Sequence, residues 1–476
     1  MTGPYRLPCE TPEAHEPDKA PGKDTRWVLP ATILGSSIAF IDGSVVNVAL
    51  PAMQRDLEAG LGTMQWVVNG YMLTLASLIL LGGSGGDRFG RRRVFMIGLA
   101  GFAAASLACG LAPSAPWLIA ARLAQGAAAA LLTPASLAII GAAYRGKARG
   151  KAIGTWAAAA ALTTALGPPL GGWLVDTVSW RAIFFINLPI AAAALLLARK
   201  LAPDGANESS EPLDGSGAAF AFAALGLLSY GFIALGEGQR NTGALALAAA
   251  LPVIWLFLRR EAGAKAPMIP LGLFRNRTFS GANALTLLLY AALGGALFLL
   301  PFLLIQVHGY SAMAAGAAFL PFSVIMGAGS RWSGGLVERF GARPPLVIGP
   351  ALTGAGFAML AFSGSDPIYW TGFLPGLTVI GVGMTIAVPP LTTTVFDASP
   401  DERSGTASGI NNAAARAGSL VAVAALGLAF GGTAPAEFAG EALASAYRLV
   451  MLAAAALAVL SALIAMLTIA PRIEEE

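Results

Sequence analysis

Hydrophobic positions along this chain come in long runs, and short polar segments separate them. A helix that crosses the hydrocarbon core of a bilayer needs about 20 mostly apolar residues. Runs near this length recur between residues 27 and 470 and predict fourteen membrane-spanning helices. Their expected bounds are 27–51, 63–83, 94–112, 116–143, 152–176, 182–199, 215–236, 243–258, 279–307, 312–336, 345–363, 368–395, 405–430 and 447–470.

Composition indicates that lipid covers much of the surface. The chain is 56% hydrophobic and only 12% charged, whereas a soluble domain is about 25% charged. The sequence pI is about 9.2, but the net charge is only +4. The basic residues fall in short segments between apolar runs, where membrane topology explains them better than a nucleic-acid partner does.

The basic residues also predict an orientation. Loops on the cytoplasmic side of a membrane carry an excess of Lys and Arg. If the N-terminus is cytoplasmic, almost every Lys and Arg falls inside, and only Arg55, Arg181, Arg240 and Arg448 fall outside. This asymmetry predicts an even number of spans, with both termini in the cytoplasm.

One polar motif occurs twice between apolar runs. The first copy contains Asp-Arg-Phe-Gly at 87–90 and the second contains Glu-Arg-Phe-Gly at 338–341. Many secondary transporters are built from such repeats, with the substrate site between them. We expect a cytoplasmic charge latch that forms an inner gate, although the arginines also suit a purely topological role. Its residues are Gly83, Asp87, Arg88, Gly90, Arg91, Arg92, Glu338, Arg339 and Arg343.

The position of the two copies predicts the domain organisation. They lie eight spans apart, so two extra spans are expected between two six-span halves. The predicted segments are a disordered cytoplasmic tail (1–26), an N-terminal half (27–200), the extra spans with their loops (201–278), a C-terminal half (279–470) and a second cytoplasmic tail (471–476).

Asp42 is the only acid well inside a predicted span. An ionised carboxylate in hydrocarbon is costly and needs a partner or a water-filled cavity. Arg122 is expected at nearly the same depth in the fourth span, because the two positions differ by about 4.5 Å along the helix axes. We predict that Asp42 carries a proton and that Arg122 tunes its pKa. A purely structural ion pair is the alternative.

Other residues within spans are candidates for packing or for a cavity. Gly167, Pro168, Pro169, Gly171 and Gly172 place small residues at helical spacing, which allows close helix packing. Polar side chains in spans are expected to face the bundle interior, where they line a cavity or bond between helices. These candidates are Asn47, Gln125, Asn411, Asn412 and Arg416.

Five motifs, in order along the predicted spans, carry a resemblance to a known family. They are Ile41 to Pro51, Gly83 to Arg93, Arg122 to Gly126, Gly167 to Gly172, and Trp180-Arg181 with the Phe and Asn residues that follow. The chain resembles the major facilitator superfamily. Within it, the chain is similar to the 14-spanner drug:proton antiporters of the EmrB/QacA type.

This resemblance implies an all-α polytopic membrane protein with the major facilitator fold, in the cytoplasmic (inner) membrane. It implies proton-coupled export of hydrophobic or amphiphilic drugs by alternating access. It also makes the segment 167–172 the antiporter hinge. One departure is that no acid lies deep in a later span, which argues against recognition of multiply charged cations.

Energy coupling and partners follow from what the sequence contains. It has no Walker-type phosphate loop, so a proton gradient is the expected energy source, with no cofactor, no metal and no enzymatic activity. We expect a monomer that exchanges small-molecule substrates and protons across a lipid bilayer. The sequence leaves open whether a periplasmic adaptor protein binds to it. The alternatives are a dedicated exporter or importer of one metabolite and, from another class, a polytopic membrane enzyme.

Overall fold

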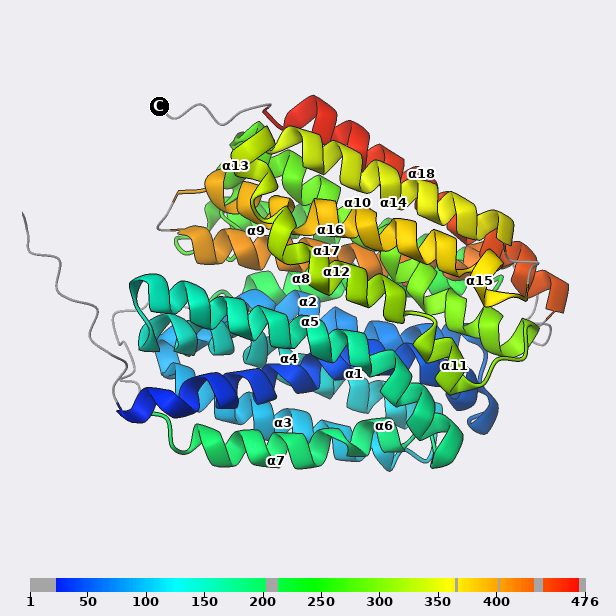
Figure 1. Ribbon diagram of the computed structural model, residues 1–476, viewed down its shortest axis with the longest axis horizontal. Helices are drawn as coiled ribbons and strands as arrows, with labels where there is room; N and C mark the ends of the chain where they lie inside the picture. The colour runs from blue at the N-terminus through cyan, green and yellow to red at the C-terminus, as the bar shows by residue number, and fades with distance from the viewer. Residues whose placement is uncertain (1–22, 203–212, 364–366, 401–402, 432–439, 471–476) are drawn as a thin grey trace, which may run out of the picture.

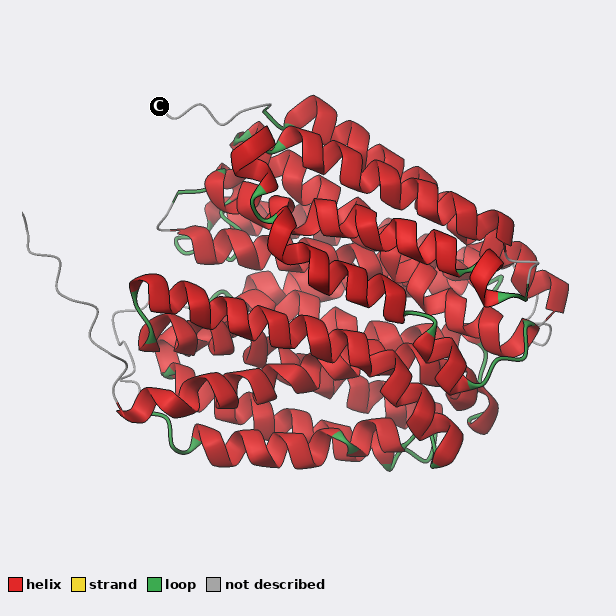
Figure 2. Ribbon diagram, viewed as in Figure 1, coloured by secondary structure: helices red, strands yellow, loops and turns green. Residues whose placement is uncertain are grey.

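Apolar helices run side by side in two bundles, which lie one below the other in Figure 1. This computed structural model describes residues 23–202, 213–363, 367–400, 403–431 and 440–470. Helices and loops account for all of that part of the chain, without a strand (Figure 2). The tails expected at 1–26 and 471–476 therefore lie outside the described residues, except for 23–26.

The lower bundle in Figure 1 is the N-terminal half. The elements are η1 (Lys23–Trp27), α1 (Val28–Asp56), α2 (Leu61–Phe89), α3 (Arg91–Gly110), α4 (Ala115–Ala143), α5 (Gly146–Thr177), α6 (Ala182–Phe185) and α7 (Asn187–Ala198). Helices α1 to α5 are long enough to cross a bilayer, and the shorter α6 and α7 together correspond to the predicted span 182–199.

Two further helices form a hairpin, and the upper bundle in Figure 1 is the C-terminal half. The hairpin consists of α8 (Gly215–Gly236) and α9 (Arg240–Gly263). The C-terminal half contains η2 (Leu271–Arg275), α10 (Arg277–Phe302), η3 (Leu303–Val307), α11 (Ala312–Ala317), α12 (Leu320–Ser333), α13 (Leu336–Phe340), α14 (Arg343–Ser363), α15 (Tyr369–Gly372), α16 (Leu374–Asp397), α17 (Ser404–Ala425), η5 (Leu426–Phe430) and α18 (Gly440–Thr468).

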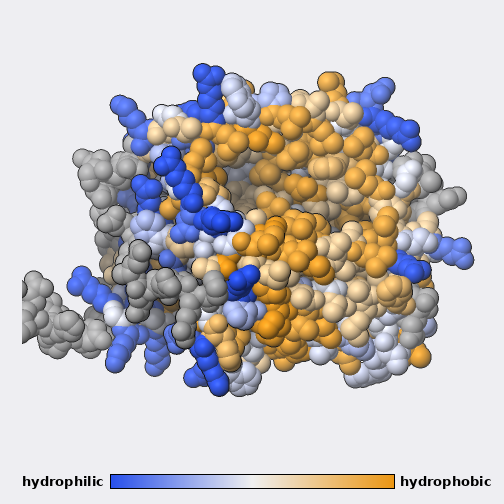
Figure 3. All heavy atoms as spheres, turned by 90° about the horizontal axis from the view of Figure 1, so that it is seen from above, coloured by the Kyte–Doolittle hydropathy of each residue, from blue (hydrophilic) through white to orange (hydrophobic). Residues whose placement is uncertain are grey.

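By length and composition, thirteen of the described helical segments could cross a membrane. The sequence predicted fourteen spans. The segment Ala182–Ala198 is apolar but shorter than the others, and it is divided between α6 and α7 at Ile186. Figure 3 shows a broad hydrophobic band between hydrophilic side chains at the two ends of the molecule. The chain is therefore a multi-pass membrane protein.

The duplicated motif is mostly helical rather than a loop. The predicted second span ends at residue 83, but α2 continues to Phe89. Gly90 then adopts a φ of 93°, and α3 begins at the next residue. In the second copy, α13 ends at Phe340 and Gly341 has a φ of 80°. Because only glycine adopts these angles readily, each Phe-Gly pair ends one helix sharply before the next.

The ends of the bundle differ in how the halves meet. We call the end that carries Lys23 and Ala470 the termini end, on the left in Figure 1, and the other the opposite end. Among the described residues, the side-chain hydrogen bonds that we find between the halves lie toward the opposite end. Gln54 pairs with Gln306 at 3.0 Å, and Gln65 donates to the Val423 carbonyl at 2.6 Å.

The α8–α9 hairpin lies against the line where the halves meet. Helix α8 packs against α2 of the N-terminal half and α17 of the C-terminal half. Near the opposite end, Gly236 of α8 approaches Gly427 so closely that a side chain on either would clash with the backbone of the other. At the termini end, Asp214 caps α8 by accepting a hydrogen bond of 2.9 Å from the Gly217 amide. Helix α8 therefore contacts both halves.

Candidate functional site

An acidic side chain lies in the middle of α1, fully buried. Asp42 is 0% exposed and is about 21 Å from the start of the helix, at 1.5 Å per residue. Its carboxylate faces α4, where Arg122 is also buried, and Nη1 of Arg122 lies 2.5 Å from Oδ2 of Asp42. The pairing that the sequence predicted from helix depth is therefore present.

Three side chains donate to this carboxylate, so both of its oxygens have partners. Besides Arg122, Gln125 of α4 donates to Oδ1 of Asp42 at 2.9 Å, and Asn187 of α7 lies 3.4 Å from the same oxygen. Ser106 of α3 accepts from both amides, at 2.8 and 3.3 Å. A buried ion pair is tolerated only when its remaining hydrogen-bonding capacity is satisfied in this way.

Arg122 is held by further contacts on its other faces. Its Nε donates to the Val67 carbonyl of α2 at 3.1 Å, and Nη1 also donates to Oε1 of Gln125 at 2.6 Å. The guanidinium lies over the Tyr71 ring at 4.4 Å and near the Phe184 ring at 5.9 Å. The two aromatic rings shield the ion pair from water and add cation–π attraction. The arrangement joins α1, α2, α3, α4, α6 and α7.

The structure revises the list of polar candidates. Gln125 was a candidate either for lining a cavity or for bonding between helices, and it bonds between helices as part of the buried ion-pair cluster, where it is 0% exposed. Sequence reasoning missed Tyr71, Ser106 and Asn187 as members of this cluster. Asn187 was detectable as an amide within an apolar run, whereas Ser106 carried no sequence signal because small hydroxyl residues are common in spans.

The remaining polar candidates lie outside that cluster. Asn411 bonds between helices, donating to the Thr286 hydroxyl at 2.7 Å. Asn412 is exposed and donates to the Ser408 carbonyl one turn earlier. Asn47 and Arg416 are half-buried. Gly43, one turn before Asn47 on α1, would meet nothing within 4 Å if it carried a Cβ, so this part of α1 faces open space.

The glycines of α5 contact two partners at once. A Cβ on Gly167 or Gly171 would clash with Ser44 or Val45 of α1. On the other side, a Cβ on Gly172 would clash with the Ala312 carbonyl of α11, which belongs to the other half. This segment, with Pro168 and Pro169 inside the helix, therefore fixes how closely the two halves approach at the opposite end.

A carboxylate that sequence reasoning missed reinforces this approach. Asp176 of α5 accepts hydrogen bonds from the backbone amides of Ala312 and Met313 at 3.1 and 2.8 Å. These amides open the first turn of α11 and have no partner within it. Figure 1 shows α11 beside the end of α5. Nothing in the sequence marks Asp176 for this role, because its partners are backbone groups of a distant segment.

The expected charge latch makes contacts within each half. Asp87 pairs with Arg91 at 2.9 Å. Arg92 donates to the Ala198 and Arg199 carbonyls at 3.1 and 2.8 Å, which ties the start of α3 to the end of α7. In the second copy, Arg343 donates to the Met466 carbonyl of α18. We find no ion pair between the halves among the residues that the structure describes.

The two copies also repeat one further contact. Arg88 lies over the Phe89 ring at 5.8 Å, and Arg339 lies over the Phe340 ring at 5.2 Å. Glu338, the counterpart of Asp87, is exposed. The two copies thus share the glycine that ends a helix and this arginine–aromatic contact. They differ because, within the part of the chain that the structure describes, only the first copy has an ion pair, between Asp87 and Arg91.

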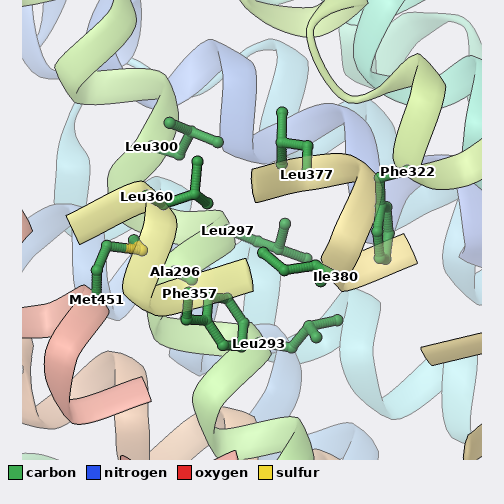
Figure 4. Close-up of a pocket in the computed structure, with 10 residues that line it drawn as sticks. All are labelled: Leu293, Ala296, Leu297, Leu300, Phe322, Phe357, Leu360, Leu377, Ile380 and Met451. Atoms are coloured by element: carbon green, nitrogen blue, oxygen red, sulfur yellow. The ribbon is translucent and has the colours of Figure 1, made fainter. Parts of the chain in front are cut away.

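One small cavity lies inside the C-terminal half (Figure 4). Apolar side chains from α10, α12, α14, α16 and α18 line it, among them Leu293, Phe322, Phe357 and Met451. It contains no polar group that could orient a ligand, so we interpret it as a packing space between helices. In the described part of the chain, no group of three His, Cys, Asp or Glu residues could hold a metal ion.

Fold and site together define a multi-pass membrane transporter with an ion pair buried in one of its two helical halves. The chain belongs to the Major Facilitator Superfamily, whose family model matches residues 32–423.

Curated relatives and a solved structure agree with this assignment. The chain is 38% identical over 403 residues to the multidrug resistance protein Stp of Mycobacterium tuberculosis (strain CDC 1551 / Oshkosh), covering 84% of this chain and 74% of the relative. It is 35% identical over 407 residues to the tetracenomycin C resistance and export protein of Streptomyces glaucescens, covering 84% and 75%. A bacterial homologue of the human lysosomal transporter Spinster, solved in an inward-facing and unoccupied conformation, has the same fold, with a TM-score of 0.66, 18% identity and coverage of 94% and 98%.

Proposed function

We propose that this protein exports hydrophobic or amphiphilic drugs and toxic compounds in exchange for protons, by alternating access. The observation that carries the proposal is the buried pair of Asp42 and Arg122, 2.5 Å apart in the middle of the N-terminal half. An ionisable group at this depth is expensive to maintain and is by default a functional site. Relatives named for multidrug resistance and antibiotic export supply the direction and the substrate class.

The proton is assigned to Asp42 because Arg122 stays charged and cannot carry it. Protonation of Asp42 would remove the attraction between the two groups. Arg122 would then retain Gln125 and the Val67 carbonyl as partners. We infer that this change favours rearrangement of α1 against α4, and that the α5 glycines transmit it to the contact with α11.

We assign the termini end to the cytoplasm, following the distribution of basic residues. The hydrogen bonds found between the halves lie at the opposite end, so this conformation is the one expected to take up substrate from the cytoplasm. The segment Ala182–Ala198 is about 25 Å long, close to the hydrocarbon thickness. We assign it as a further span, which gives the fourteen spans of the EmrB/QacA type in the cytoplasmic membrane.

The test is transport in proteoliposomes that hold the purified protein. An imposed proton gradient should drive accumulation of a drug that the wild type exports, and adding the drug should release protons. A protein that moves drug down its gradient but never against it would contradict antiport.

A second candidate is export of one specific compound. It is favoured by the relative whose name gives a single compound, tetracenomycin C. Transport of only one member of a chemically varied panel would support it.

A further inference from the structure

A cation without an acidic partner lies in the middle of α17. Arg416 is twelve residues from the start of the helix at Ser404, which places it about 18 Å along the axis. Its side chain is half-buried. Among the described residues, no carboxylate oxygen lies within 4.0 Å of the Arg416 guanidinium, which is the limit for an ion pair. No hydrogen bond donated by this guanidinium is found either. It differs in this from Arg122, the other arginine deep in a span.

Helix α17 places Arg416 at the boundary between the halves. It packs against α10 of its own half and against α2 of the other half. One turn after Arg416, Ser419 donates to the Tyr290 carbonyl of α10 at 3.0 Å, and two turns before it Gly409 adjoins Leu80 of α2. Helix α2 also carries Tyr71, whose ring contacts Arg122. Arg416 therefore belongs to the C-terminal half but lies on a helix that packs against a helix of the ion-pair cluster.

The acid nearest in depth is not available to Arg416. Asp42 is 0% exposed, and its two oxygens already accept from Arg122, Gln125 and Asn187. The buried pair of Asp42 and Arg122 is electrically neutral, so Arg416 leaves one uncompensated positive charge in this region. Such a charge deep in a membrane protein is costly unless water or a counter-anion meets it.

The surroundings of Arg416 suit an amphiphilic ligand. Asn412 lies one helical turn from Arg416, is exposed, and keeps its side-chain oxygen and one amide hydrogen for another partner. A guanidinium binds a carboxylate through two parallel hydrogen bonds, and an adjacent amide adds a third donor.

We propose that Arg416 binds the anionic group of the exported compound, so that the preferred substrates are amphiphilic weak acids such as aromatic carboxylates. The inference rests on the proposed export function, whose substrate class it narrows. An apolar ring system would occupy the space between the halves, with its carboxylate on Arg416 and Asn412. Cationic amphiphiles of the same shape would be repelled by the same charge.

The test is binding to the purified full-length protein in detergent at pH 7, measured by titration calorimetry. The probes share one ring system: 2-naphthoate is an anion, 2-naphthamide is neutral and 2-naphthylmethylammonium is a cation. We expect the wild type to bind the anion about tenfold or more tightly than the amide, and the cation most weakly. Equal affinity for all three, or no binding of 2-naphthoate at about 1 mM, would overturn the proposal.

Substitutions then identify the residue responsible. Arg416→Gln should remove the preference for the anion, while Arg416→Lys should retain part of it because the charge stays. Arg448→Gln is the matched control, since Arg448 is exposed, lies over the Phe362 ring and forms no ion pair with any described residue. If Arg416→Gln and the control bind 2-naphthoate with the wild-type affinity, Arg416 is not the anion site.

This design separates the two proposals. Binding requires no gradient, so the calorimetry decides the anion preference whether or not the protein transports. Absence of proton-driven transport in proteoliposomes would contradict antiport alone. Conversely, proton-driven export of neutral compounds with no preference for acids would contradict the anion site alone. If Arg416→Gln does not fold, the three-probe comparison on the wild type and on Arg416→Lys still decides the proposal.

Discussion

The carboxylate of Asp176, at the end of α5, accepts hydrogen bonds from the backbone amides of Ala312 and Met313, at the start of α11. A side chain of one half thus caps a helix of the other half. The same two segments touch through Gly172 and the Ala312 carbonyl. In the proposed alternating-access cycle these bonds must break when the opposite end opens, so they would help to determine which conformation is populated.

Replacing Asp176 should shift the protein toward the conformation in which the opposite end is open. Loss of a cap costs about 1 kcal/mol, so Asp176→Ala should change the ratio of the two conformations about fivefold. Distances between spin labels at Leu111 and Trp370, two exposed positions at that end, would measure the change. An unaltered distance distribution in Asp176→Ala would show that this cap does not influence the equilibrium.

Asp42→Asn should abolish drug accumulation against a gradient while retaining drug binding, because asparagine resembles the protonated acid and cannot exchange a proton. Arg122→Ala should be more disruptive, since it leaves a buried carboxylate without its counter-charge, at a cost of about 3–5 kcal/mol in the free energy of unfolding. Proteoliposome transport measures the first effect and thermal unfolding the second. Gradient-driven accumulation by Asp42→Asn would mean that another group carries the proton.

Gly172→Val should slow transport strongly, because the larger side chain would clash with the Ala312 carbonyl whenever the halves meet at the opposite end. The matched control is Gly150→Val on the same helix, where a Cβ would meet nothing within 4 Å. Both variants lose a glycine from α5, so the difference between their efflux rates reports the contact between the halves. Equal rates would argue that this contact is not required for the transport cycle.

The stability that Asp214 contributes should depend on pH at the acidic end of the scale. Burial alone would raise the pKa of Asp214, but hydrogen bonds from the Gly217 amide and the Ser216 hydroxyl, together with nearby Arg260, lower it below 3.8. A carboxyl whose folded-state pKa is depressed stabilises the fold when it is ionised. The contribution is complete above the ordinary pKa and is lost as the pH falls through the folded value.

Asp214→Ala should therefore lower the stability of the protein by about 1 kcal/mol at pH 7, as expected for a lost helix cap. The difference from the wild type should shrink as the pH falls below about 3.8. Thermal unfolding followed by tryptophan fluorescence across this range would measure it. A difference that stays constant down to the lowest accessible pH would contradict an ionised cap.

Cysteine labelling along α9 should establish the orientation of the chain. Thr242 and Gly263 lie near the two ends of this one helix, and both are exposed. A thiol at position 242 should react with a membrane-impermeant reagent added outside the cell, and a thiol at position 263 only after the membrane is permeabilised. The reverse pattern would invert the orientation assigned from the basic residues.

The lengths of the apolar runs and the positions of the basic residues predicted most of the helices, because lipid imposes long apolar segments and basic residues gather on one side. The pairing of Asp42 with Arg122 followed from their depths alone. The break at Ile186, which divides α6 from α7, was not predicted, because the segment 182–199 reads as one continuous apolar run.

Two kinds of contact escaped sequence analysis for the same physical reason. The bonds from Asp176 to the first turn of α11 and from Arg92 to the end of α7 both end on backbone groups. A backbone amide or carbonyl is present at nearly every position, so no residue type marks the partner. The Asp42 cluster was only partly predicted, because Ser106 and Tyr71 become relevant once three-dimensional packing brings α3 and α2 beside the ion pair.

Helix α8 limits how hydrophobic molecules could reach the space between the two halves from the bilayer. Two seams separate the halves along the membrane: one lies between α2 and α17, and the other lies between α5 and the pair α11–α12. Helix α8 covers the first seam, with α9 packed behind it, and we find no comparable cover over the second among the described helices. Under the proposed export function, a compound dissolved in the bilayer would therefore have one side entrance rather than two, and the bilayer would supply substrate from a single flank.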